Sequence, residues 1–230
     1  MVMKLRHTEL SIPAGPIWLR ANLAHAPDVR ALVIVAQTAV GQHESSREAY
    51  FAAALQAQGF ATLLLDLITR HEDERDPDVR FNTPLLATRI DAVLDWLDHQ
   101  PPLIGLSRGL CANGTGSGAA VRAASRAEGR LHALFCRGGR LDLAGAGPLA
   151  TLTQPVFVVA GRDDPGRDMI ARAYALIRTE KKWQDIGHAG ALFVEPGTLE
   201  TVSKLAAQWL DATLPPPTPA SAPPEDAPAT

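Results

Sequence analysis

Three short runs of apolar residues constrain the fold of this chain more than any other feature. They are Ala31–Ala36 (ALVIVA), Ala61–Leu67 (ATLLLDL) and Val156–Ala160 (VFVVA). Each run is continuously apolar rather than alternating, which is typical of a strand that is buried on both faces. Such strands belong almost only to parallel sheets that carry helices on both sides. We therefore expect an α/β fold with a mostly parallel central sheet.

Helical patterns separate these runs and complete the expected order of elements. The pattern predicts helices over Glu44–Gln58, Pro84–His99, Asp168–Ile177 and Leu199–Leu210, and further strands over Gly109–Asn113, Leu131–Cys136 and Lys182–Ile186. Gly59 suits the end of the first helix, and Ile90, Val93, Leu94 and Leu97 follow helical spacing in the second. Thr8–Pro13 and Ile17–Leu23 predict an antiparallel hairpin at the sheet edge, whereas Thr69–Phe81 is charged and rich in turn residues.

Composition and charge exclude several classes of function. A net charge of −3 offers no basic patch for nucleic acid or for an anionic lipid surface. No apolar run reaches the ~18 residues of a membrane span or has the length of a signal-peptide core, so we expect a cytoplasmic protein. Cys111 and Cys136 are too few for a disulfide framework. We expect one domain over residues 1–213 and a disordered Pro/Ala-rich tail over 214–230 (from Leu214, LPPPTPASAPPEDAPAT).

Five segments resemble one known family. They are ATLLLDLITR from Ala61, TPLLATRIDAVLDWL from Thr83, RGGRLDLAG from Arg137, FVVAGRDD from Phe157 and LFVEPGTLETVSKLAAQWL from Leu192. Over residues 8–212 the chain resembles the dienelactone-hydrolase-like branch of the α/β-hydrolases. The resemblance implies the α/β-hydrolase fold. It also implies a Ser-Asp-His hydrolase of esters, lactones or thioesters that needs no metal or cofactor.

The residues that the resemblance assigns to catalysis are mostly replaced. The register G-A-S-T-G of the nucleophile elbow, a sharp strand-to-helix turn, falls on Ala112–Gly116 and puts Gly114 in the place of the nucleophile. The base directly precedes L-F-x-E-P-G, which puts Ala191 in its place, and only the acid is retained, as Asp163.

The backbone that would stabilise an oxyanion is also altered. The H-G-S-G-S-S-R-like loop of the family corresponds to residues 37–43. Gln37, Thr38 and Thr115 are therefore the residues that we expect to line the pocket.

Three residues nevertheless leave a relocated triad open. Ser107 lies in Gly105–Gly109 (GLSRG), a G-x-S-x-G pattern, and Cys111 lies in GLCANG, which is similar to the elbow of dienelactone hydrolases proper. His188 stands three positions before Ala191 in the loop where the base belongs. Ser107 or Cys111 with Asp163 and His188 would form an ester or lactone hydrolase. Equally, Cys111 suits a packing residue, Asp163 a helix cap and His188 an exposed loop.

Three functional interpretations follow. The leading one is a non-hydrolytic member of the fold that binds a small molecule or a protein partner. The second is the hydrolase with the relocated triad. The third is a different enzyme, such as a lyase or cyclase, that uses Arg137, His43 or His188 in the same pocket. Membership in a fold does not choose among them, because function resides in the site.

Overall fold

The computed structural model describes residues 4–127 and 129–216, and within them one eight-stranded sheet runs in the order β1-β2-β4-β3-β5-β6-β7-β8. The strands are β1 (Arg6–Ala14), β2 (Ile17–His25), β3 (Ala31–Gln37), β4 (Phe60–Asp66), β5 (Arg108–Asn113), β6 (Ala133–Arg137), β7 (Val156–Gly161) and β8 (Lys181–Ile186). The helices are α1 (Ser46–Gln56), α2 (Arg70–Arg75), α3 (Thr83–Leu97), α4 (Gly116–Ala124), α5 (Ala146–Thr151), α6 (Arg167–Ala175) and α7 (Thr198–Thr213).

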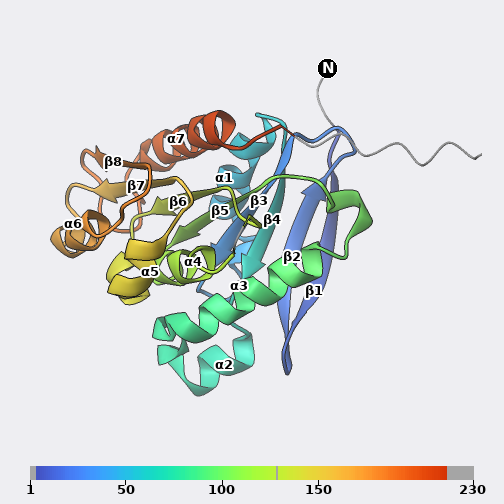
Figure 1. Cartoon of the computed structure of the whole chain (residues 1–230), viewed down its shortest axis with the longest axis horizontal. Helices are drawn as coiled ribbons and strands as arrows, with labels where there is room; N and C mark the ends of the chain where they lie inside the picture. The colour runs from blue at the N-terminus through green and yellow to red at the C-terminus, as the bar shows by residue number, and fades with distance from the viewer. Residues whose placement is uncertain (1–3, 128, 217–230) are drawn as a thin grey trace, which may run out of the picture.

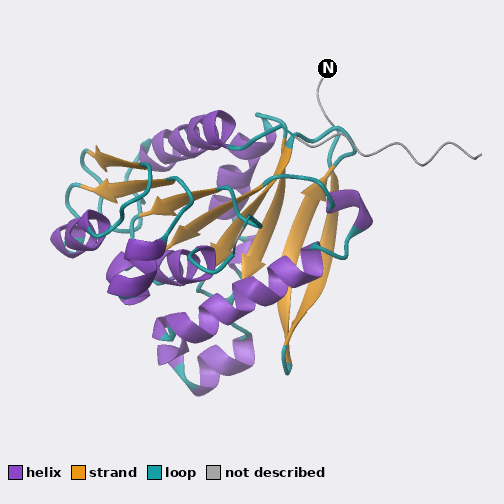
Figure 2. Cartoon of the chain, viewed as in Figure 1, coloured by secondary structure: helices purple, strands orange, loops and turns teal. Residues whose placement is uncertain are grey.

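The pairing of the strands confirms the expected α/β fold. Strands β3 to β8 pair in parallel, whereas β1 and β2 form an antiparallel hairpin that joins the sheet through β4. Every residue of β3, β4 and β7 is buried, as the continuous apolar runs predicted. Figure 2 shows the single twisted sheet between two layers of helices.

Successive residues of each strand serve two separate cores, one on each face of the sheet. In β3, Leu32 and Ile34 belong to the core that α3, α4 and α6 cover. Val33 and Val35 belong to the core under α1 and α7. Figure 1 shows α7 on one face of the sheet and α3 and α4 on the other. The side-chain period of two in a strand makes both faces apolar and therefore requires helices on both sides.

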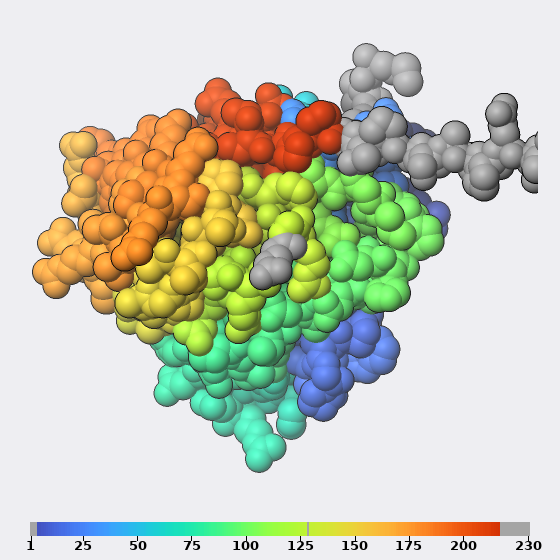
Figure 3. Space-filling view, viewed as in Figure 1, coloured from blue at the N-terminus to red at the C-terminus, as the bar shows by residue number. Residues whose placement is uncertain are grey.

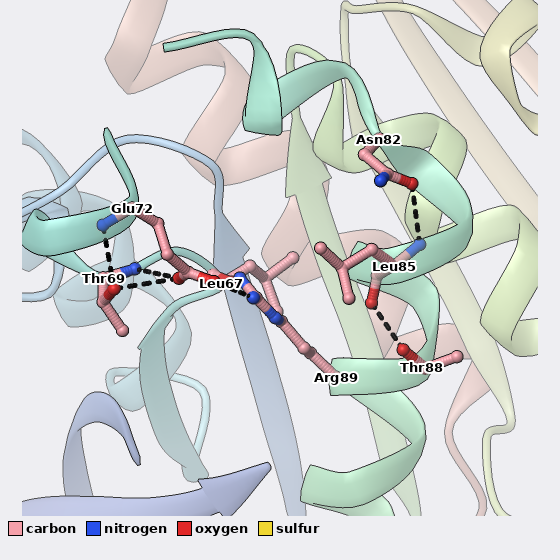
Figure 4. A network of polar contacts seen from close by, with 7 residues as sticks. All are labelled: Leu67, Thr69, Glu72, Asn82, Leu85, Thr88 and Arg89. Atoms are coloured by element: carbon pink, nitrogen blue, oxygen red, sulfur yellow. Dashed lines mark hydrogen bonds and ion pairs between the residues drawn. The ribbon is translucent and has the colours of Figure 1, made fainter. Parts of the chain in front are cut away.

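Polar side chains begin the first three helices. Ser45 Oγ accepts the N–H of Glu48 at α1, and Asn82 Oδ1 accepts the N–H of Leu85 at α3 (Figure 4). At α2, Thr69 and Glu72 form a reciprocal capping box. These oxygens satisfy N–H groups that have no partner inside the helix.

The segment predicted as a turn-rich connection contains more structure than expected. Residues 69–81 hold α2 and a 3-10 turn at Pro77–Phe81, and neither has a buried residue. Arg89 of α3 fixes this segment, because it donates to the carbonyl of Leu67 at 2.6 Å and pairs with Glu72 (Figure 4). Without a buried face, the segment leaves no hydrophobic periodicity in the sequence.

Two further expectations concern the ends of the domain and the membrane. The tail expected over 214–230 lies outside the described residues except for its first three, of which Pro215 accepts a hydrogen bond from Ser107 Oγ at 2.7 Å. Within the described ranges, no helix has both the length and the apolar character needed to cross a membrane.

Candidate functional site

A cavity of about 360 Å³ lies where β3, β5 and β6 end, and we call it the elbow cavity. Its lining consists of Gln37, Thr38, Ala39, Gln42, Arg47, Glu48, Asn113, Gly114, Arg137, Ala191, Leu192, Phe193 and Val194. The chain continues from β3 to β4 on one side and then places β5 on the other side of β3. Ligands of open α/β sheets bind at such a switch point, beyond the carboxyl ends of the strands.

Gly114 forms the sharp turn between β5 and α4. Its φ is +51°, a left-handed conformation that glycine adopts without steric cost. A Cβ atom placed on Gly114 would meet only Thr38 Oγ1, at 4.0 Å, so the turn has room for a side chain. Thr38 Oγ1 also accepts a hydrogen bond from Thr115 Oγ1 at 3.1 Å. The turn therefore has the backbone of an elbow but no reactive atom at its tip.

The Gly138-Gly139 turn after β6 supports the Gly114 turn from the side. A Cβ atom on Gly139 would lie 2.2 Å from the carbonyl oxygen of Gly114, so only glycine fits there. That carbonyl accepts the N–H of Arg140 at 2.9 Å, and Ser117 Oγ donates to the carbonyl of Gly138 at 2.9 Å. The pair Arg137 and Arg140 is thus split, because Arg140 forms a two-point ion pair with Asp142 instead.

A buried charged network forms part of the lining of the elbow cavity. Arg137 Nη2 donates to Glu48 Oε1 at 2.5 Å, and Gln37 Nε2 donates to Glu48 Oε2 at 2.9 Å. The Arg137 guanidinium also lies over the ring of Phe51, 5.0 Å from its centre. Arg137 Nη1 is buried and finds no hydrogen-bond partner in the described residues. A buried donor without an acceptor costs free energy.

The loop after β8 forms the opposite wall. Arg47 Nη2 donates to the carbonyls of Leu192 and Phe193 at 2.7 and 3.2 Å, which ties the loop to α1. Phe193 is buried with a φ of +51°, whereas Leu192 is 72% exposed. Ala191 is exposed and lines the cavity together with Gly114.

Asp163 and His188 follow β7 and β8, and their backbones are close. The N–H of Asp163 donates to the carbonyl of Ala189 at 3.0 Å, and a Cβ atom on Gly161 would lie 2.3 Å from that same oxygen. Both Asp163 and His188 are exposed, and no hydrogen bond or ion pair joins their side chains in the described chain. Neither side chain lines the elbow cavity.

The structure does not bring Ser107 to this site. Strand β5 begins at Arg108, so Ser107 lies at the amino end of the strand, whereas Gly114 follows its carboxyl end. A nucleophile at Ser107 would need a strand that ends just before it, but Pro101–Leu103 is a 3-10 turn and Gly105 has a φ of +83°. Ser107 Oγ instead donates to the carbonyl of Pro215.

Cys111 lies inside β5, between Val35 of β3 and Phe135 of β6. Its side chain belongs to the core under α1 and α7 and is 2% exposed. Burial raises the pKa of the Cys111 thiol far above its ordinary value. A thiol held neutral in a packed core is a poor nucleophile, so this position matches the packing interpretation.

Two polar groupings escaped the sequence reasoning. One is the Gln37–Glu48–Arg137 network, whose members come from three separate elements. The other is a pair between His43 and Asp66, in which Asp66 ends β4. The signal that could have pointed to Asp66 is a carboxylate at the end of an otherwise apolar strand (ATLLLD).

Known proteins resemble this chain in sequence and in fold. No family model matches the chain. A protein of Mycobacterium tuberculosis (strain H37Rv), which bears the name "Putative phosphoribosyl transferase", is 37% identical over 205 residues, which cover 89% of this chain. The protein of the same name from strain CDC 1551 matches equally. The chain spans about half the length of these curated relatives, 46% of each.

Solved structures match along almost the whole chain. The crystal structure of a dienelactone hydrolase from Anabaena variabilis has a TM-score of 0.87 and 34% identity, and the match covers 93% of this chain and 100% of that one. A dienelactone-hydrolase-like promiscuous phosphotriesterase from metagenomic libraries has a TM-score of 0.69 at 18% identity over 90% of this chain and 98% of its own. Est1E from Butyrivibrio proteoclasticus has a TM-score of 0.70 at 16% identity, and the match covers 88% of this chain and 97% of that one. These last two show the fold alone.

Proposed function

Because the chain belongs to the dienelactone-hydrolase-like branch of the α/β-hydrolase family, we propose that it is a non-hydrolytic member that binds a small molecule in the elbow cavity. One observation carries the proposal. Gly114 and Ala191 line the same cavity, at the two places where the family resemblance puts the nucleophile and the base. Glycine and alanine supply neither an attacking atom nor a proton acceptor.

The chemistry of the lining supports binding rather than acyl transfer. Among the described residues around the cavity there is no serine, cysteine or histidine. The polar groups present are the amides of Gln37, Gln42 and Asn113, the hydroxyl of Thr38, the guanidinium groups of Arg47 and Arg137, and the carboxylate of Glu48, which Arg137 and Gln37 already pair. Amides and a hydroxyl orient a ligand through hydrogen bonds, and a buried guanidinium donor favours a carbonyl or carboxylate oxygen. We infer an ester, lactone or carboxylic acid that is held intact.

The name of the M. tuberculosis relatives is not a basis for assigning transferase activity to this chain. More than half of each relative lies outside the match. The described lining of the elbow cavity also contains no serine, cysteine or histidine on which a covalent transfer step could be argued.

The first test is turnover of a short aryl ester by the purified chain beside His188→Ala and a blank without protein. We expect no turnover above the blank in either protein. Turnover that disappears in His188→Ala would contradict the proposal and restore the relocated triad.

Binding is tested with methyl benzoate, an ester that stays intact in buffer, by saturation-transfer NMR. We expect a signal in the native chain that Ala191→Trp removes, because the indole would fill the elbow cavity. The matched control is Ala175→Trp, which adds the same side chain at an exposed alanine of α6 outside the cavity lining. Equal loss in both variants would argue against binding in the elbow cavity.

A further inference from the structure

A second and larger cavity, of about 570 Å³, lies on the other side of the loop after β3, and we call it the dyad cavity. Its lining consists of Ser11, Trp18, Arg20, Val40, Gly41, His43, Glu44, Asp66, Ile68, Thr69, Arg70 and His71. It shares no lining residue with the elbow cavity. Figure 3 shows the blue hairpin of β1 and β2 beside the blue-green segment that contains α2, the two walls of this cavity.

A buried histidine–carboxylate pair forms the floor of the dyad cavity. His43 Nδ1 lies 2.7 Å from Asp66 Oδ2, and the exposed fractions of the two residues are 9% and 2%. Asp66 also accepts the N–H of Gly41 at 2.7 Å and the N–H of His43 at 2.9 Å. Because three donors already occupy the carboxylate, Asp66 orients the imidazole and is not itself available to a ligand.

The second ring nitrogen of His43 is left for a ligand. Nε2 lies 3.4 Å from Glu44 Oε1, and the Glu44 side chain is 65% exposed at the cavity rim. Such an exposed carboxylate loses little by turning to solvent, since surface ion pairs contribute little. The Nε2 atom therefore has only this weak contact with Glu44 among the described residues, and a ligand can replace it.

Two arginines and a second histidine also line the wall. Arg20 has one polar contact, with Ser11 Oγ at 3.4 Å. Arg70 and His71 form no ion pair or side-chain hydrogen bond within the described residues and are exposed. Two guanidinium groups supply donors from several directions, which suits a phosphoryl group with its three oxygens.

An aromatic ring stands at the same site. Trp18 lines the dyad cavity with 62% of its surface exposed, which is unusual for so large an apolar side chain. An exposed indole next to arginines provides a face on which a planar ring stacks. The cavity volume lies within the range of small-molecule sites.

We propose that the dyad cavity binds a phosphorylated small molecule with a planar ring. Arg20 and Arg70 hold the phosphoryl group, His43 Nε2 accepts a hydrogen bond from an adjacent hydroxyl, and Trp18 stacks on the ring. This site is independent of the elbow cavity, and ligand binding there does not depend on Gly114 or Ala191.

The test is a titration of the full chain with AMP at constant ionic strength, followed by tryptophan fluorescence and by calorimetry. We expect AMP to quench the fluorescence and Trp18→Phe to remove that quenching. Arg70→Ala and Arg20→Ala should each weaken AMP binding about 10-fold or more, because each removes charge-assisted hydrogen bonds. Adenosine, which lacks the phosphoryl group, should bind far more weakly, and inorganic phosphate should compete.

Arg75→Ala is the matched control, since it removes one exposed arginine from the same helix outside the cavity lining. It should leave AMP affinity unchanged. The proposal is overturned if AMP does not bind at millimolar concentration, if adenosine binds as tightly as AMP, or if Arg75→Ala weakens binding as much as Arg70→Ala.

Discussion

A Cβ atom added to Gly114 would meet only Thr38 Oγ1, at 4.0 Å, and Ala191 is an exposed residue on the same cavity. We therefore predict that Gly114→Ser combined with Ala191→His introduces hydrolysis of aryl esters. A base that takes the proton of the nucleophile contributes about 10²–10⁴-fold, so the double variant should exceed Gly114→Ser alone by about 10²-fold. The measurement is the initial rate of aryl-ester turnover for the double variant and both single variants.

The same change carries a cost in stability. Serine at a φ of +51° is strained by about 1–2 kcal/mol, which a urea unfolding curve of Gly114→Ser would report as a lower midpoint. If the double variant is folded yet no faster than Gly114→Ser, then Ala191 does not occupy the place of the base, and the interpretation of both positions fails.

The roles of the residues in the turn after β6 could not be predicted from the sequence. The motif Arg137-Gly138-Gly139-Arg140 was visible in the sequence as part of a segment that resembles the family. Glycine is required at position 139 because of a contact with a distant segment, since a Cβ atom there would collide with the backbone of Gly114. The roles of the arginines were equally hidden, because Glu48 and Asp142 reach them from other elements.

At the scale of elements, α2 illustrates how a helix forms without a buried face. Thr69 and Glu72 cap it reciprocally, and Arg89 of α3 holds Glu72 and the carbonyl of Leu67. Hydrophobic periodicity could not predict α2, because the helix contributes nothing to the core. By contrast, Ile90, Val93, Leu94 and Leu97 of α3 are fully buried, as their spacing predicted.

We predict that Arg89→Met lowers the free energy of unfolding at neutral pH by about 1.5–3 kcal/mol, the usual contribution of hydrogen bonds to charged groups. Burial opposes ionisation of Glu72, but hydrogen bonds from Arg89 and Thr69 outweigh it and hold its pKa below the ordinary value. This stabilisation is present above the unfolded pKa of about 4.3 and is lost as pH falls through the folded pKa. The difference between native and variant should therefore shrink in acid.

Urea unfolding at pH 7 and at pH 3 measures both effects. The matched variant is Arg75→Met, which changes an exposed arginine of α2 and should shift neither curve. A loss in Arg89→Met that is equally large at both pH values would mean that packing of the arginine stem, rather than its pairing with Glu72, stabilises the segment.

In the whole molecule, the carboxyl ends and the amino ends of the parallel strands have different roles. Both cavities lie at the carboxyl ends of the strands, where loops from several elements meet. The sheet and its layers could be predicted because apolar runs and helical spacing are local in the sequence. The cavities could not, since each combines residues from segments far apart along the chain, and the dyad cavity also takes residues from the β1–β2 hairpin. The position of Ser107 could not be predicted for the same reason: its G-x-S-x-G pattern is local, but whether Ser107 lies at the amino or the carboxyl end of a strand depends on where β5 begins.

A histidine at the amino ends of the parallel strands should set part of the pH dependence of the free energy of unfolding. His132 Nδ1 accepts the N–H of Arg108 at 3.2 Å, next to the start of β5. Burial lowers the pKa of His132, and the nearby charge of Arg108 acts in the same direction. The native state therefore prefers the neutral ring, whereas the unfolded chain takes up a proton below about pH 6.5. The contribution of His132 is complete above that pH and falls as pH drops toward the folded pKa.

We predict that His132→Asn flattens the fall in unfolding free energy between pH 8 and pH 5, because the Asn side-chain oxygen still accepts the N–H of Arg108 but does not titrate. The measurement is the urea midpoint of both proteins at several pH values in this window. His99→Asn, at an exposed histidine just after α3, should keep the native slope. A native slope in His132→Asn would place the acid sensitivity elsewhere. Because His132 lies near the amino end of β5 and Gly114 follows its carboxyl end, the variant should also bind methyl benzoate as the native chain does.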